Sequence, residues 1–311
     1  MKLKRYAAID IGTNAVRLLI ANVIKNGKEW KVKKNTLVRV PVRLGEDVFD
    51  KGSISQEKAK DLVKTMQAFR LLMDVFKVDD YLAVATSAMR EAENAREILK
   101  KIKEETGIEI EVIDGAREAE FIAQTDLDDL TDPSKNYLFV DVGGGSTEFT
   151  VLEQGKKTAS RSFKLGTVRS LKNTIPEGEW EKAKQWIEKH TGHLDKIDLI
   201  GSGGNINKLF KMSGKAPGTP LSYIHLKALY KMLKSMSYKQ RIKELGLNPD
   251  RADVIVPAAK IYSKAMKWSG GKKIYVPSIG LADGIVKYLA DKNRRKETEN
   301  SSTKKSATRK K

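Results

Sequence analysis

The sequence predicts an α/β protein with two similar halves that face a shared phosphate-binding cleft. Two stretches carry this prediction: residues 6–23, YAAIDIGTNAVRLLIANV, and residues 137–151, YLFVDVGGGSTEFTV. Each reads as an apolar strand ending in an aspartate, a glycine turn with a hydroxyl group, and a second apolar strand. A strand–turn–strand unit that occurs twice in the same context is stronger evidence for a phosphate site than a single glycine motif. The competing explanation for the repeat is chance similarity between short turns. A third glycine turn follows an apolar run in residues 197–209, IDLIGSGGNINKL.

A length of 311 residues suits two domains better than one. The polar loop TDPSKN at residues 131–136 is the natural joint, which divides the chain into residues 1–130 and 131–292. The last apolar segment, residues 281–290, is a candidate to fold back onto the first domain. Residues 293–311 contain no large apolar side chain and are expected to form a disordered basic tail.

The composition excludes several kinds of chemistry. The chain has no cysteine, which excludes disulfides, thiolate metal sites and cysteine nucleophiles, and its three histidines do not favour a zinc site. No apolar run is long enough to span a membrane and no signal peptide is recognisable, which predicts a cytoplasmic protein. The net charge of +19 suits a polyanionic partner, with nucleic acid bound only non-specifically through the basic tail.

The turn after residue 142 has the features of a phosphate site. Gly143, Gly144 and Gly145 can adopt positive φ and leave the backbone open to a ligand, and Ser146 adds a donor. Asp141 and Glu148 flank this turn, and their charges would repel a phosphate unless a cation lay between them. The pattern therefore indicates Mg²⁺, with Mn²⁺ as the alternative ion. An ordinary glycine-rich hairpin turn is the competing interpretation.

The first half continues with elements of mixed type. A strand hairpin over residues 4–24 and a further strand over 29–44 precede a helix that begins at Ser55, a typical cap residue. Apolar residues at helical spacing form its core face: Leu62, Met66, Phe69, Met73 and Phe76. A strand over residues 80–85 then leads into TSAMREAENA, where Thr86 and Ser87 mark a strand-to-helix junction of the kind that binds anions.

Two arginines of the first half are candidate phosphate ligands. Arg17 lies among apolar residues of the returning strand and needs an anionic partner, either a phosphate or a structural carboxylate. Arg90, one turn into the helix after residue 86, could reach the same ligand or lie on the surface.

A strand over residues 108–113 and a turn at Asp114–Gly115 precede the helix AREAEFIAQTDL. Glu118 shares a helix face with Phe121 and Ile122, whereas Glu120 falls on a wetter side. A carboxylate on a partly apolar face has a raised pKa and can accept a proton from water. The competing interpretation is that Glu118 only complements the helix dipole.

The second half repeats the pattern of the first. We expect a hairpin over residues 137–153, strands over 157–165, 197–200 and 274–276, and a loop over 211–220. Helices are expected near residues 177–188, 205–210, 226–233, 238–244, 249–263 and 281–289.

Six motifs occur in order across the chain and together resemble one family. They are DIGTNAVRLLI (10–20), ATSAMREAENA (85–95), IDGAREAEFI (113–122), VDVGGGSTEF (140–149), GSGGNINKL (201–209) and NPDRADVIVPAAKI (248–261). The sequence resembles the exopolyphosphatase and guanosine pentaphosphate phosphohydrolase (Ppx/GppA) family in its short, two-domain form, over residues 4–290. The resemblance implies two ribonuclease-H-like α/β domains of the actin, sugar-kinase and Hsp70 superfamily around a central cleft. It also implies Mg²⁺-dependent removal of a terminal phosphoryl group by water, and a homodimer.

The resemblance also implies roles for individual residues. Glu118 matches the glutamate that activates water, and Glu148 assists it. Asp141, Glu148 and Asp10 are the implied metal ligands. Implied substrate contacts are Thr13, Asn14, Arg17, Arg90, Gly143, Gly144, Gly145, Ser146, Gly203 and Gly204.

Three features depart from the family pattern. Asn205 stands where a threonine is usual, the helix sequence AREAE keeps Glu120 as a second candidate base, and the chain ends without the helical C-terminal region of the long members. Inorganic polyphosphate is the leading substrate and guanosine pentaphosphate its competitor. Two further hypotheses are an ATP-dependent small-molecule kinase of the same fold and a polyanion sensor without turnover.

Overall fold

The computed structural model describes residues 2–26, 29–125 and 132–308. A first sheet of five strands has the order β3-β2-β1-β4-β5. β1, β2 and β3 form an antiparallel meander, β4 runs parallel to β1, and β5 runs parallel to β4. The strands are β1 (Lys2–Ile11), β2 (Val16–Asn26), β3 (Glu29–Val40), β4 (Asp80–Ala85) and β5 (Ile110–Val112).

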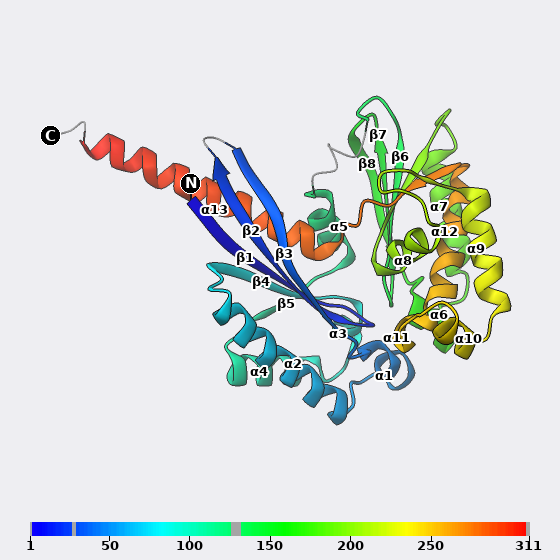
Figure 1. Cartoon of the computed structure of the whole chain (residues 1–311), viewed down its shortest axis with the longest axis horizontal. Coiled ribbons are helices and arrows are strands. Elements are labelled where there is room, and N and C mark those ends of the chain that lie inside the picture. Colours follow the sequence, from blue (N-terminus) through cyan, green and yellow to red (C-terminus); the bar gives the residue numbers. More distant parts are fainter. Residues whose placement is uncertain (1, 27–28, 126–131, 309–311) are drawn as a thin grey trace.

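The second sheet repeats this arrangement and adds one short edge strand. Its order is β10-β11-β9-β6-β7-β8, with an antiparallel meander from β6 to β8, and with β9 and β11 continuing in parallel on the other side of β6. The strands are β6 (Tyr137–Val142), β7 (Thr147–Glu153), β8 (Lys156–Phe163), β9 (Asp198–Ser202), β10 (Leu221–Ser222) and β11 (Lys273–Tyr275). The expected fold class, two similar mixed α/β domains, is confirmed (Figure 1).

Helices cover both sheets. Those of the first part are α1 (Leu44–Lys51), α2 (Gln56–Val75), α3 (Ser87–Glu91), α4 (Ala95–Thr106) and α5 (Gly115–Ala123). Those of the second part are α6 (Thr167–Lys172), α7 (Glu179–Thr191), α8 (Gly204–Met212), α9 (Tyr223–Ser235), α10 (Tyr238–Lys243), α11 (Pro249–Ala252), α12 (Ile255–Ser269) and α13 (Leu281–Thr308).

Three apolar clusters hold these layers together. One joins the first sheet to α2 and α4, and a second joins the other sheet to α7, α9 and α12. The third contains residues of both sheets together with α5 and α13. Its strand residues alternate with those of the first two clusters, so Tyr137 and Phe139 face α13 whereas Leu138 and Val140 face the opposite side. Both sheets thus pack against α5 and α13 (Figure 1).

Polar contacts also join the two halves on the side of α1. Arg39 pairs with Asp250 at 2.5 Å, and Arg43 pairs with Asp253 at 2.5 Å. Arg169 of α6 is buried, donates to Glu91 of α3, and lies 3.8 Å from the ring centre of Phe49. Because these pairs come from segments far apart in the sequence, they fix how the domains face each other.

The structure corrects several expected elements. The helix expected over residues 249–263 is two helices, α11 and α12, which are separated at Asp253 and Val254. The strand expected over residues 29–44 ends at Val40, and the sequence pattern did not predict α1 or α6. The tail expected to be disordered continues α13 to Thr308, because its lysine, arginine and glutamate residues favour a helix and it contains no glycine or proline. The domain boundary expected at residues 130 and 131, and residues 309–311, lie outside the described residues.

Gly284 is the point of closest approach between α13 and α5. A Cβ atom at this position would lie 1.9 Å from the backbone oxygen of Phe121. We predict that Gly284→Ala lowers the free energy of unfolding by about 1–3 kcal/mol, since the overpacking outweighs the gain of about 1 kcal/mol in helix propensity. Denaturant unfolding measures this change. Gly280→Ala is the control, because a Cβ there meets nothing within 4 Å. Equal stability of the two variants would contradict the packing described.

Candidate active site

A row of polar side chains crosses the second sheet where its strands end. The register pairs Asp141 with Glu148 and with Ser202, and Glu148 with Ser162. Side chains that face each other on adjacent strands lie on the same side of the sheet, so this row presents two carboxylates together. The hydroxyls of Ser146 and Ser162 each donate to Glu148 Oε1 at 2.7 Å. Glu148 is therefore held from both sides.

Glu118 joins this row from α5. Asp114 caps the helix, its side chain accepting from the N–H of Arg117, and Gly115 packs against Ser162 of β8. This contact brings the first turn of α5 over the second sheet. Glu118, Asp141 and Glu148 are all buried, and each offers an oxygen within 4.8 Å of the others. Glu118 Oε2 is buried and has no hydrogen-bond partner.

These three carboxylates fit a divalent cation. Oxygen ligands are those that Mg²⁺ and Mn²⁺ prefer, and an orphaned buried oxygen is expected where a ligand completes the site. The predicted metal ligands Asp141 and Glu148 are thus brought together, with Glu118 added. Asp10, also predicted, is buried nearby but pairs with Arg17 at 2.6 Å.

Burial and mutual repulsion raise the pKa of each carboxyl group. Burial raises the pKa of Glu118 well above its usual value, and the charges of Glu148 and Asp141 raise it further. The pKa of Asp141 rises to about 6, mainly by burial, and that of Glu148 to about 7, by burial and by Asp141. In the protein without a cation, the cluster therefore keeps protons at neutral pH.

The glycines of the turn after β6 are required for a reason other than the expected one. The sequence allows positive φ at Gly143, Gly144 and Gly145, but none of them adopts it. They instead provide space: a Cβ at Gly144 would lie 2.7 Å from Thr13, and one at Gly145 would lie 2.0 Å from Ser87 Oγ. Among the hydrogen bonds of the described residues, none uses the N–H of Gly144 or Gly145. Two backbone donors are thus free for an anion.

The third glycine turn requires glycine for its conformation. Gly203 has φ 105° and ψ 159°, a region that only glycine adopts readily. A Cβ at Gly203 would lie 3.1 Å from Asp141 Oδ1, so this turn lies against the acidic cluster. Gly204 begins α8, which gives the turn a helix N-terminus beside the cluster.

The first sheet carries a matching row with cationic members. The register places Asp10 opposite Arg17, and Arg17 opposite Arg39. Two arginines at facing positions repel each other unless anions neutralise their charges. Asp10 pairs with Arg17, and Asp250 pairs with Arg39. Of the two partners that the sequence allows for Arg17, the structure therefore shows the carboxylate.

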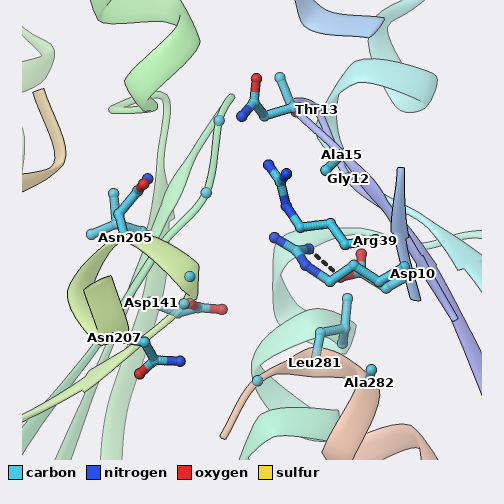
Figure 2. Close-up of a pocket in the computed structure, with 18 of the residues that line it drawn as sticks. Asp10, Gly12, Thr13, Ala15, Arg39, Asp141, Asn205, Asn207, Leu281 and Ala282 are labelled. Atoms are coloured by element: carbon cyan, nitrogen blue, oxygen red, sulfur yellow. Dashed lines mark hydrogen bonds and ion pairs between the residues drawn. The ribbon is translucent and has the colours of Figure 1, made fainter. Parts of the chain in front are cut away.

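The first row, Asp10, Arg17 and Arg39, and Asp141 of the second row line a cleft of about 530 Å³. Figure 2 shows Asp10 and Arg39 on one wall and Asp141, Asn205 and Asn207 on the other. The predicted substrate contacts that line it are Thr13, Asn14, Arg17, Gly143, Gly144, Gly145, Ser146, Gly203 and Gly204. The side-chain amide of Asn14 donates to the backbone oxygen of Asp250, at 3.0 Å, and thereby links the two halves.

Three predicted candidates, Glu148, Arg90 and Glu120, lie outside this lining. Arg90 donates to the backbone oxygen of Ile113 at 2.6 Å and is placed where its charge favours ionised Glu118 and Glu148. Glu120 is exposed and pairs with Arg117 at 2.8 Å. The helix geometry thus separates Glu118 from Glu120, as the sequence pattern predicted.

Several cationic residues of the cleft are not indicated by the sequence motifs. These are Lys34, Arg39, Lys208, Lys211 and Arg251. The sequence could have indicated Arg39, because a charged residue between two valines in a strand is unusual. Arg251 stands in the motif at residues 248–261 and in the first turn of a predicted helix, but it was given no role in the sequence analysis.

The fold and the site together define an α/β protein of two mixed sheets whose cleft combines glycine turns with a buried acidic cluster. A model of the Ppx/GppA phosphatase family matches residues 36–293. The chain belongs to the Ppx/GppA phosphatase family and is a hydrolase of that family.

The chain is similar to curated proteins of different lengths. It is 31% identical over 296 residues to the bifunctional 3-dehydroquinate synthase/phosphatase of Fusobacterium nucleatum, covering 87% of this chain and 44% of that protein. The chain thus spans less than half of that relative. It is 28% identical over 322 residues to exopolyphosphatase 2 of Mycobacterium tuberculosis, covering 93% of this chain and 100% of the relative.

Solved structures show the same likeness. An exopolyphosphatase from Cytophaga hutchinsonii matches with TM-score 0.79 and 26% identity, over 93% of this chain and 98% of that one. The Ppx/GppA family member of Aquifex aeolicus matches with TM-score 0.73 and 28% identity, over 94% and 99%. Within the part of the chain that the structure describes, no helix is long and apolar enough to cross a membrane.

The acidic cluster predicts a pH dependence of stability in the metal-free protein. A carboxyl group whose pKa is higher in the folded chain than in the unfolded chain stabilises the folded state at low pH, and this contribution is lost as the pH rises through the folded pKa. For Asp141 and Glu148 the window runs from about pH 4 to about pH 7. Glu118→Gln removes a carboxyl group whose pKa is raised by burial and by the charges of Glu148 and Asp141, so its stability relative to the unmodified protein should improve as the pH rises.

Chemical denaturation at several pH values measures this difference. Glu120→Gln is the matched control, since it makes the same substitution at an exposed side chain outside the cluster. Excess Mg²⁺ at pH 7 should stabilise the unmodified protein more than Glu118→Gln. If the free energy of unfolding of Glu118→Gln, relative to that of the unmodified protein, decreased as the pH rises, the carboxyl groups of the cluster would not be protonated as described.

Proposed function

We propose that the protein releases terminal orthophosphate from inorganic polyphosphate, with Glu118 as the group that accepts a proton from the attacking water. The observation that carries this proposal is the cleft itself, which is acidic at one end and basic at the other. The family consists of phosphatases, and relatives named exopolyphosphatase support polyphosphate as the substrate.

Each end of the cleft suits one part of such a substrate. Glu118, Asp141 and Glu148 would hold Mg²⁺ or Mn²⁺, which when bound offsets phosphate charge and polarises a phosphoryl oxygen. The free N–H groups of Gly144 and Gly145 would donate to the terminal phosphate. Such donors stabilise the charge that develops on the transferred group.

Glu118 is the carboxylate placed to activate water. Its Oε2 atom is buried and unpaired, whereas Glu148 Oε1 accepts from Ser146 and Ser162. Glu148 is thus held in one orientation and suited to positioning, and Glu118 retains an oxygen for a proton. A raised pKa brings the proton affinity of Glu118 closer to that required near neutral pH.

Guanosine pentaphosphate is the second candidate substrate. Apolar residues line one part of the cleft, Leu37, Ile279 and Leu281, and Leu37 is 61% exposed. A base could cover these side chains while its phosphates occupy the polar part. Orthophosphate release from polyphosphates of several lengths, compared with release from guanosine pentaphosphate, decides between the two by kcat/KM. Absence of release from either, with binding retained, would favour a sensor without turnover.

Glu118→Gln tests the proposed base. The variant keeps the size of the side chain but cannot accept the proton, so turnover should fall by about 10²–10⁴-fold with little change in KM. Glu120→Gln should keep the activity of the unmodified protein, because its side chain pairs with Arg117 outside the cleft. Activity of Glu118→Gln together with loss of activity in Glu120→Gln would reverse the assignment.

Glu148→Gln should give a different defect. Glu148 is held by two serines next to Asp141, so its neutral form should weaken cation binding more than water activation. We expect a higher Mg²⁺ concentration for half-maximal activity, with partial recovery at saturating Mg²⁺. Titrations of Mg²⁺ and of Mn²⁺ on this variant measure the effect, with Glu120→Gln as the reference. An unchanged cation requirement would remove Glu148 from the metal ligands.

A further inference from the structure

We propose that Tyr262 is a positioning residue of the acidic site, because its phenol holds the ends of β6 and β9 together and thereby orients Asp141 for the cation. Tyr262 directly follows the last sequence motif, which ends at residue 261, and the sequence pattern gave it no role. This inference rests on the proposed function, in which Asp141 is a cation ligand.

Tyr262 carries a polar group in the apolar layer between α12 and the second sheet. The side chain is fully buried and belongs to the cluster that joins α12 to β6 and β9 (Figure 1). Phenylalanine would fill the same space, whereas a buried hydroxyl destabilises the protein unless it finds a partner. The hydroxyl of Tyr262 donates to the backbone oxygen of Ser202, the last residue of β9. The phenol is therefore anchored at the end of that strand.

The phenol lies where β6 and β9 separate into two glycine turns. Asp141 and Ser202 form the last residue pair of these strands, and the turns at residues 143–145 and at Gly203 follow. Burial raises the pKa of Tyr262 well above its usual value, the charge of Asp141 raises it further, and a hydrogen bond with the backbone of Val142 lowers it. The phenol thus stays protonated at neutral pH and contacts both strands.

The hydrogen bond to Ser202 fixes a peptide group that glycine would otherwise leave free to rotate. Gly203 has φ 105°, and glycine permits many backbone conformations at low cost. Because the peptide group is planar and trans, an oxygen held toward Tyr262 points the N–H of Gly203 in the opposite direction. Gly203 lines the cleft, whereas Tyr262 is fully buried behind it. The turn is therefore held with this N–H on the cleft side.

Ser202 transmits the constraint to Asp141. Its hydroxyl lies between two acceptors, the carboxylate of Asp141 and the backbone oxygen of Ile279 at 3.1 Å. A Cβ at Gly203 would lie 3.1 Å from Asp141 Oδ1 and 3.6 Å from the phenol oxygen of Tyr262. Carboxylate, turn and phenol are thus packed together, and a displacement of Ser202 also displaces Asp141.

Cation binding tests this role without requiring turnover. Mg²⁺ is titrated calorimetrically into the full chain in the absence of any phosphate compound. Tyr262→Phe keeps the ring that fills the core and removes only the hydroxyl. Mg²⁺ binding should weaken about 10- to 100-fold, as is typical when a group that orients a metal ligand is lost. The melting temperature should fall by a few degrees, because a buried backbone oxygen loses its donor.

Tyr137→Phe is the matched control. Tyr137 is also buried, at the opposite end of β6, and its hydroxyl accepts from the N–H of Asp132 at 3.1 Å. The control should lower the melting temperature to a similar extent but change Mg²⁺ affinity by less than about twofold, because the two sites are independent. Equal weakening of Mg²⁺ binding by both variants would reduce Tyr262 to a structural role. Unchanged Mg²⁺ affinity in Tyr262→Phe would overturn the proposal.

Ser202→Ala tests the route from Tyr262 to Asp141. If Tyr262 acts through Ser202, the double variant should weaken Mg²⁺ binding less than the product of the two single effects. Fully multiplicative effects would overturn this route, and absence of Mg²⁺ binding by the unmodified protein would overturn the role of Tyr262. Failure to release orthophosphate from polyphosphate would instead overturn the proposed function, because Mg²⁺ binding is measured without substrate.

Discussion

Three carboxylates buried within reach of one another are the constraint on which the rest of the structure depends. Glu118, Asp141 and Glu148 are each less than 10% exposed, and their charges repel in a medium that solvates them poorly. Such a cluster persists only when protons, hydrogen bonds or a cation offset the repulsion. Two serine hydroxyls donate hydrogen bonds to Glu148. Among the described residues Glu118 Oε2 has no hydrogen-bond partner, so the repulsion between the carboxylates is only partly offset. A divalent cation held by the three carboxylates would offset the remaining repulsion.

The cluster can exist only because α5 and α13 lie between the sheets. Asp141 and Glu148 belong to one sheet, whereas Glu118 arrives on a helix whose apolar face packs against α13. Gly284 permits that close packing, and Gly115 permits the contact with β8. The site is thus shared between the two halves, and any change in their relative position alters the distances between the carboxylates.

The two halves repeat the same topology but carry side chains of opposite charge at equivalent positions. At equivalent places in the two sheets, one row reads Asp10, Arg17 and Arg39, and the other reads Asp141, Glu148 and Ser162. In the first row Arg17 pairs with Asp10, whereas within the described part of the chain no ion pair involves Asp141 or Glu148 of the second row. This asymmetry produces a cleft with an acidic and a basic end, which a symmetric repeat could not provide.

The local sequence pattern alone determined the two-fold repeat, most of the strands and the helix cap at Ser55. It also determined that Glu118 and Glu120 lie on different faces of their helix. These features follow from the sequence because strand alternation and helical spacing depend only on neighbouring residues. The sequence motifs also indicated Asp141 and Glu148 as a pair. Only the tertiary structure decided that Glu118 joins them, that Arg17 is paired with Asp10, and that Arg39 and Arg251 line the same cleft. It also showed that Gly143–Gly145 are needed for space and not for positive φ. These features depend on contacts between segments up to two hundred residues apart, and neither period nor propensity contains that information.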